Sequence, residues 1–149
     1  MGLEKEIQQE KFSSEYEKVA VNILFTGSWL HQLNASRLKS HGLTPEQYNV
    51  LRILRGSHPK TLKLSEITCR MIDKNSNATR LVEKLRLKGL LKRERCENNR
   101  RQVDVFITEK GLTALKKIDQ EEASWMSRLK NITKSEAAEI NRLLDKLRG

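Results

Sequence analysis

The chain has 149 residues and a formal net charge of +10, and its length favours one domain built around a single core. A mean hydropathy of −0.65 and the lack of a long apolar run exclude a transmembrane segment, and the charged N-terminus argues against a signal peptide. Two cysteines, 27 positions apart, do not form a disulfide scaffold. We therefore expect a cytoplasmic protein whose excess positive charge meets a polyanion.

The first predicted element is a long helix from about Leu3 to Ser40, where apolar residues recur at steps of three and four. About 36 residues would span about 54 Å, whereas a compact domain of this size has a radius of gyration of about 15 Å. Such a helix must project and needs a partner chain, although a kink at Gly27-Ser28 would shorten its reach. The residues assigned to contact with a second copy are Phe12, Tyr16, Val19 and Ile23.

The next helix has a clear start signal. Thr44 is its predicted N-cap, Pro45 occupies the first helical position and Gln47 completes a capping box. Gly56 and Pro59 are expected to end it.

Two short helices and a ribbon are predicted next. The first helix runs from Leu64 to Met71 or Ile72. After a turn of three or four residues, the second begins with Asp73 or Lys74 at its cap and ends at Gly89. The apolar period then changes to two, so residues 90–95 and 102–107 are predicted to pair around a polar tip at residues 96–99.

The C-terminal part is predicted to be helical. Thr108 caps a helix expected to reach about Lys130, and Thr133 opens a last helix with a second capping box. On that last helix, apolar residues recur at steps of three and four, including Ile140, Leu144 and Leu147.

These elements predict a winged helix-turn-helix, because two short helices joined by a turn precede a two-stranded ribbon. The expected fold class is mainly α with a small β-ribbon wing, flanked by long terminal helices. Residues 1–40 are expected to form the N-terminal helical part, 41–110 the winged helix-turn-helix and 111–149 the C-terminal helices.

The positive charge is concentrated on the second short helix and the ribbon, because residues 74–101 hold ten bases and only three acids. In this motif the start of the second helix enters the major groove, where Asn pairs with adenine and Arg or Lys with guanine. Polar residues that only cap and solvate a helix start would give the same pattern. The residues assigned to DNA on this basis are Lys74, Asn75, Ser76, Asn77, Thr79, Arg80, Lys84 and Arg93.

Several blocks of the sequence resemble the MarR family of bacterial transcriptional regulators in order and spacing. They are residues 43–48 before the motif, 67–71 and 76–85 in it, and 88–93 and 100–111 around the wing. The resemblance assigns DNA contacts to Arg100 and Arg101, with Arg101 favoured. Asn99 departs from the family, which commonly has an Asp there that would pair with and orient an arginine.

Members of that family are homodimers whose terminal helices intertwine. The resemblance therefore implies one intertwined domain, in which residues 1–40 and 111–149 are dimerisation helices and 41–110 are the DNA-binding region. It also assigns Ile140, Leu144 and Leu147 on the last helix to dimerisation.

The resemblance further implies a homodimeric regulator, most often a repressor, that binds a pseudo-palindrome in double-stranded DNA with half-sites about one helical turn apart. Many members bind a small aromatic or phenolic effector between the dimerisation helices and the DNA-binding lobe. Phe25, Trp29 and Tyr48 are candidates to line such a pocket, with ordinary core packing as the other interpretation.

The main alternative is a winged-helix adaptor that binds protein without specific DNA binding. We expect no enzyme, cofactor or metal, because the three histidines and two cysteines lack ligand spacing and nothing frames a nucleophile. Cys69 is expected to be a buried structural thiol. Cys96, between Arg95 and Glu97, is a minor candidate for redox chemistry.

Overall fold

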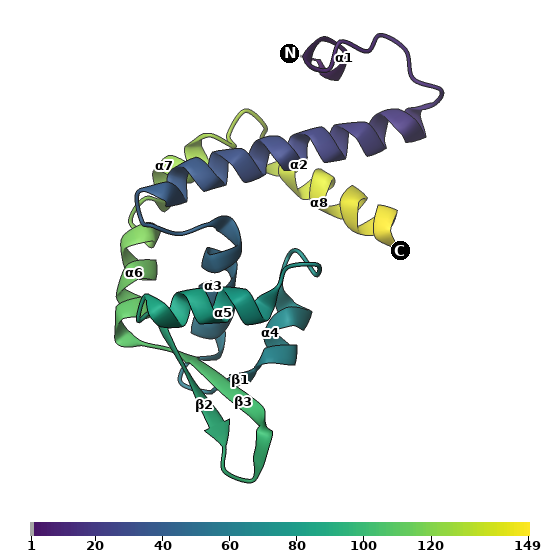
Figure 1. Ribbon diagram of the computed structural model, residues 1–149. Coiled ribbons are helices and arrows are strands. Elements are labelled where there is room, and N and C mark those ends of the chain that lie inside the picture. Colours follow the sequence, from purple (N-terminus) through teal and green to yellow (C-terminus); the bar gives the residue numbers. More distant parts are fainter. Residues whose placement is uncertain (1) are drawn as a thin grey trace.

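The computed structural model describes residues 2–149, apart from the side chain of Arg100. It is mainly helical with one small sheet, as predicted. In chain order the elements are α1 (Leu3–Glu6), α2 (Glu15–Lys39), α3 (Pro45–Ser57), β1 (Leu62–Lys63), α4 (Leu64–Arg70), α5 (Ala78–Leu87), β2 (Leu91–Cys96), β3 (Asn99–Ile107), α6 (Glu109–Asp119), α7 (Glu122–Ser127) and α8 (Lys134–Arg148). Figure 1 shows α2 across one end of the molecule and the β2–β3 ribbon projecting from the other.

The predicted winged helix-turn-helix forms the middle of the molecule. The β2–β3 ribbon is antiparallel, and β1 adds a third strand on the other side of β3, giving the order β1-β3-β2. The sequence pattern does not predict β1, because a strand of two residues is too short to show alternation.

One buried core holds these elements together. Fully buried residues come from α3 (Leu51), α5 (Leu85), β3 (Val105) and α6 (Leu115 and Ile118). Because the second helix and the base of the wing share this core, packing holds the two elements against each other at that base.

The N-terminal helix differs from its prediction, because it is broken between residues 7 and 14. Gln8 adopts a left-handed backbone conformation with φ 55°, which a continuous helix does not allow. A new helix then begins where the side chain of Ser14 accepts a hydrogen bond from the backbone amide of Glu17. α2 continues through Gly27-Ser28 without interruption and is about 38 Å long.

The second helix of the motif starts later than predicted. Its N-cap is Asn77, whose side chain accepts from the backbone amide of Arg80 at 3.1 Å, so Asp73 and Lys74 lie in the preceding turn. Asp73 instead accepts from the amide of Asn75 at 2.9 Å, which is an Asx turn. The C-terminal glycine is confirmed, since Gly89 has φ 73°.

Two further boundaries, one in the wing and one after α6, also need correction. The ribbon turns at Glu97-Asn98, because Cys96 and Asn99 pair with each other rather than lying in the loop. The helix expected to reach Lys130 is split into α6 and α7 at Gln120-Glu121. Both sides of this break are tied to other elements, by an ion pair of Asp119 with Arg55 at 2.6 Å and by a hydrogen bond between Glu121 and His41 at 3.1 Å.

Three predicted caps are confirmed. Thr44 and Thr133 form capping boxes with Gln47 and Glu136, and Thr108 accepts from the amide of Gly111. α8 is folded as predicted, yet none of its described residues is fully buried.

Candidate nucleic-acid interface

The turn between α4 and α5 is fixed by side chains that accept backbone hydrogen bonds. Asn49 on α3 accepts from the amide of Ile72 at 2.9 Å, which anchors the start of the turn. The Asx turn of Asp73 and the cap of Asn77 then order the rest. The predicted residues Lys74, Asn75 and Ser76 therefore lie on an ordered turn that leads into α5, and not on the helix itself.

Nearly all the side chains predicted to contact DNA on this turn and helix face solvent. Ser76 is half-buried, whereas the others are exposed: Lys74, Asn75, Asn77, Thr79, Arg80 and Lys84. Two of them also have a local structural role, because Asn77 caps α5 and Lys74 donates to the carbonyl of Cys69. The first turn of α5 contains no acidic residue that would repel an anion.

The wing presents Arg101 to solvent and holds its backbone in place. Asn99 accepts a hydrogen bond from the amide of Arg101 at 3.1 Å. Asn99 therefore orders the main chain at the start of β3, a role that needs no carboxylate. Arg101 is exposed, and the side chain of Arg100 lies outside the part of the chain that the structure describes.

Arg93 does not stand free on the wing, because its guanidinium pairs with Glu83 of α5 at 3.1 Å. Glu83 also pairs with Arg86 at 2.6 Å. A hydrogen bond from Arg86 outweighs the effect of burial and, with the nearby charge of Arg86 and Arg93, lowers the pKa of the Glu83 carboxyl below its ordinary value. Sequence reasoning missed this link, because residues 83 and 93 share no periodic pattern.

Comparison with known proteins shows what this region is similar to. The MarR family model matches residues 43–103, which run from the residue before the cap of α3 into β3. This match covers less than half of the chain, and it makes the winged helix-turn-helix similar to that of the MarR family.

Two curated proteins are similar to the same region. The uncharacterised HTH-type transcriptional regulator YkoM of Bacillus subtilis (strain 168) is 35% identical over 80 residues, which are 54% of this chain and 51% of that protein. The transcriptional repressor MprA of Escherichia coli (strain K12) is 28% identical over 81 residues, which are 54% of this chain and 46% of MprA. The chain thus spans about half the length of the curated relatives it matches.

Solved structures extend the likeness beyond the MarR motif. A mutant of MarR from E. coli, crystallised with operator DNA, superposes with a TM-score of 0.81 over 93% of this chain and 99% of that chain. The two sequences are 23% identical, so this comparison bears on the fold. It covers the terminal helices as well as the winged helix.

At the end of the molecule opposite the MarR-type wing, apolar side chains predicted to meet a second copy are open to solvent. Tyr16 on α2 is 85% exposed, and Val19, Ile140 and Leu147 are also exposed. The other three predicted contact residues, Phe12, Ile23 and Leu144, are half-buried.

A pocket of about 500 Å³ lies where α2 and α3 meet the turn of the MarR motif. Tyr48 lines it as predicted, whereas Phe25 and Trp29 are not among its lining residues, and Trp29 is 47% exposed. The turn contributes Met71, Ile72, Asp73 and Ser76 to the wall. That these residues line the pocket was not predictable from the sequence, since only the tertiary fold brings the turn against α2.

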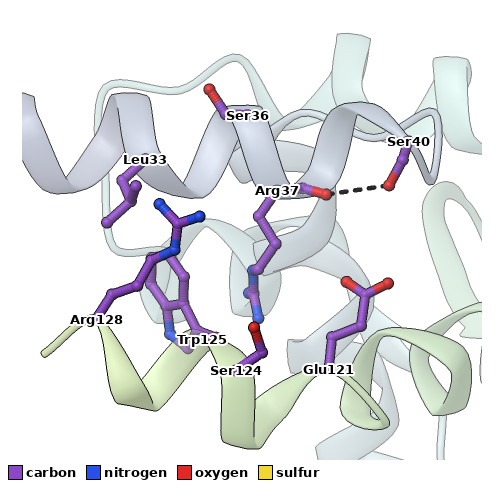
Figure 2. Close-up of a pocket in the computed structure, with 8 residues that line it drawn as sticks. All are labelled: Leu33, Ser36, Arg37, Ser40, Glu121, Ser124, Trp125 and Arg128. Carbon is purple, nitrogen blue, oxygen red and sulfur yellow. Dashed lines mark hydrogen bonds between the residues drawn. The ribbon is translucent and has the colours of Figure 1, made fainter.

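Arg37 and Trp125 line both this pocket and a smaller one of about 340 Å³ between α2 and α7. Its guanidinium lies between two aromatic rings, 4.4 Å from the ring centre of Trp125 and 5.4 Å from that of Tyr48. Figure 2 shows the Arg37 side chain reaching from α2 toward α7, with Arg128 beside Trp125. The charge of Arg37 thus belongs to the walls of both pockets.

The remaining features concern the part of the chain that the structure describes. It contains no cluster of three or more metal-ligating side chains, and none of its helices is long and apolar enough to cross a membrane. Cys69 is exposed, which corrects the prediction of a buried thiol, because it lies on the outer side of α4 while Ile67 faces the core. Cys96 is half-buried at the end of β2.

Proposed function

We propose that this chain is a homodimeric, sequence-specific regulator of transcription that binds a pseudo-palindrome in double-stranded DNA and acts in the cytoplasm, most simply as a repressor. The MarR relationship supports a regulator. The E. coli MarR mutant crystallised with operator DNA supports the duplex as ligand, and the repressor MprA supports the direction of regulation.

The observation that carries this proposal is the concentration of exposed cationic and polar side chains on the start of α5 and on the wing. Residues 74–101 carry seven of the ten net positive charges. These are the two elements that a winged helix presents to the major groove and to the neighbouring backbone or minor groove.

The exposed side chains divide into two roles. Thr79 and Arg80 project from the first turn of α5 and are proposed to reach base edges. Lys84 and Arg101 supply phosphate contacts that strengthen binding to any sequence. Asn77 uses its carbonyl oxygen as the helix cap, which leaves its amide N–H groups for DNA.

Salt-dependent binding tests this proposal. In fluorescence anisotropy with a labelled duplex of mixed sequence, Arg101→Ala is expected to weaken binding and to reduce the slope of log K against log salt by about one. Lys39→Ala, which removes the same charge at the end of α2 away from the wing, is the control and should change neither value. A protein with no duplex affinity at moderate salt would favour the adaptor function instead.

Dimerisation is proposed to occur through α2 and α8, because both helices expose apolar side chains at the same end of the molecule. Sedimentation is expected to give twice the chain mass. Leu144→Asp should shift the protein toward the monomer, whereas Asn141→Asp, with the same change of charge on α8, should not. A monomeric wild type would refute this part of the proposal.

The pocket at the turn is proposed to hold a small aromatic or phenolic effector. Its volume of about 500 Å³ suits such a molecule. A ligand there would touch Ile72, which is 89% exposed and leads directly to Lys74 and Asn75. Effector binding would thereby change the turn that faces DNA.

Phenol and benzoate are suitable probes of this pocket. Each is expected to raise the melting temperature and to weaken DNA binding, and Tyr48→Ala should reduce both effects. No change in melting temperature with either probe would count against an effector of this class.

A further inference from the structure

Glu83 connects the second helix of the motif to the wing. Its carboxylate receives two hydrogen bonds from Arg86 on the same helix, at 2.6 and 3.0 Å. The same carboxylate lies 3.1 Å from the guanidinium of Arg93 on β2. One acid therefore bridges two cations that belong to different elements.

The strand register places Arg93 on the side of the wing that faces the helices. Arg93 pairs with Val105 across the antiparallel ribbon, and directly opposite residues project to the same face of a sheet. Val105 is completely buried in the core. Arg93 therefore points toward the body of the protein, where Glu83 meets it.

A second set of contacts holds the base of the wing. Thr108 donates its hydroxyl to the carbonyl of Gly89 at 2.7 Å, and Lys110 donates to the carbonyl of Lys88 at 2.9 Å. These bonds fix the first residues after α5. The Glu83–Arg93 pair acts two residues into β2, where the ribbon begins to project.

We propose that Glu83 is a positioning residue that sets the orientation of the wing relative to α5 and thereby the DNA sequence selectivity. This inference rests on the proposed function. A duplex offers the major groove and the next phosphates or minor groove at fixed separation, so α5 and the wing bind together only when their mutual angle fits. A bridge between the two elements stabilises one such angle.

The negative charge of Glu83, considered by itself, predicts that removing this acid strengthens DNA binding. The positioning role predicts that binding to the preferred sequence weakens. A carboxylate on a basic DNA-binding surface repels phosphates, so its neutralisation should tighten binding to every sequence. The lowered pKa of Glu83 keeps it ionised at neutral pH, which makes this repulsion real. The positioning role and the repulsive role therefore predict different signs for the change in specific affinity.

Glu83→Gln measures which role dominates. The probes are the highest-affinity duplex recovered from a random library and a scrambled duplex of the same length. We expect Glu83→Gln to bind the scrambled duplex at least as tightly as the wild type does, while the ratio of specific to non-specific affinity falls about tenfold. Glu94→Gln is the matched control, since Glu94 is an exposed acid of the wing without an ion pair to any described side chain. It should leave the ratio unchanged.

A double variant tests whether Glu83 acts through Arg93. The combination Glu83→Gln with Arg93→Gln is expected to lose no more selectivity than Glu83→Gln alone, because the bridge is already broken. The inference would be overturned by an unchanged ratio of specific to non-specific affinity in Glu83→Gln. It would also be overturned by a double variant that loses more selectivity than Glu83→Gln alone. Either result would leave the proposed function intact. A wild type that binds no duplex would instead refute the proposed function.

Discussion

At the scale of single residues, Asn77 joins folding to DNA binding. Its carbonyl oxygen caps α5 by accepting from the amide of Arg80, while its side chain remains exposed on the surface that we propose meets DNA. A substitution there affects both properties unless the new side chain preserves the cap.

Two substitutions of Asn77 separate these properties. Asn77→Ala is expected to lower the free energy of unfolding by about 1 kcal/mol, because the cap is lost. Asn77→Asp keeps an acceptor at the cap and should retain stability, yet its negative charge should weaken binding to any duplex. Urea unfolding and anisotropy measure the two effects. Equal destabilisation by Ala and Asp would contradict the capping role.

The pair of His31 and Glu46 gives the molecule a predictable response to acid. Burial of the Glu46 carboxyl raises its pKa, but hydrogen bonds from His31, its own backbone amide and Thr44 outweigh this effect. The pKa of Glu46 therefore lies below its ordinary value of 4.5. Because the folded state holds the proton less tightly than the unfolded state, this stabilisation is present above the ordinary value and is lost as the pH falls through the lowered pKa.

The variant Glu46→Gln tests this direction of the pH dependence of stability. The melting temperature of the variant should lie below that of the wild type at pH 7, and the difference should shrink as the pH falls below about 4.5. Glu122→Gln, at an exposed position without an ion pair to any described side chain, is the control and should show a smaller change. If the difference in melting temperature between Glu46→Gln and the wild type stayed constant from pH 7 to pH 3, the assigned role of Glu46 would be contradicted.

The N-cap of a helix can be predicted from the sequence where only one suitable capping residue is present. Thr44 and Thr133 are each followed three residues later by the Gln47 or Glu136 of a capping box, whereas Thr108 stands directly before an apolar helical run, and all three caps are confirmed. Asn77 was missed as the cap because Asp73 and Ser76 are equally good acceptors nearby, and only the tertiary contact of Asn49 with the turn selects among them.

At the scale of elements, the wing depends on how α6 packs against its base. Gly111 in the first turn of α6 is buried, and a Cβ added there would lie 2.6 Å from the side chain of Ile107 and would also clash with the carbonyl of Leu90. Both neighbours belong to the base of the wing, and one of them is backbone. This close approach explains why a glycine occupies a helical position.

Gly111→Ala is therefore expected to destabilise the fold by about 1–3 kcal/mol, because the packed backbone must shift. Gly56→Ala is the matched control, since a Cβ at that helical position meets nothing within 4 Å. It should stabilise the protein by about 0.5–1 kcal/mol. Thermal unfolding of the two variants measures the contrast, and similar changes in both would argue against tight packing at Gly111.

The pattern of elements was largely predictable, and the errors have different causes. Helices α3, α4, α5 and α8 and the ribbon follow from apolar periodicity because each packs or pairs with one face. The start of α2 has a local signal, the cap of Ser14 with Glu17, which the prediction of one long helix overlooked. The break between α6 and α7 interrupts a sequence without Pro and is located by contacts such as that of Arg55 with Asp119. The pocket likewise depends on segments far apart in sequence, and only one of its three predicted residues, Tyr48, lines it.

At the scale of the whole molecule, the wing and the exposed apolar surface lie at opposite ends. The wing projects from one end, α5 and its basic turn lie in the middle, and α2 and α8 expose apolar side chains at the other end (Figure 1). Two copies joined at the apolar end would present two basic surfaces side by side to one duplex. Symmetry of the dimer then requires an inverted repeat in the DNA.

Selection of bound sequences from a library of random duplex DNA tests this account most directly. The account predicts recovery of an inverted repeat whose half-sites lie about 10 base pairs apart, centre to centre, with one half-site for each copy. Recovery of a single unrepeated site, or of no preferred sequence at moderate salt, would contradict the claim of a dimeric, sequence-specific DNA-binding protein.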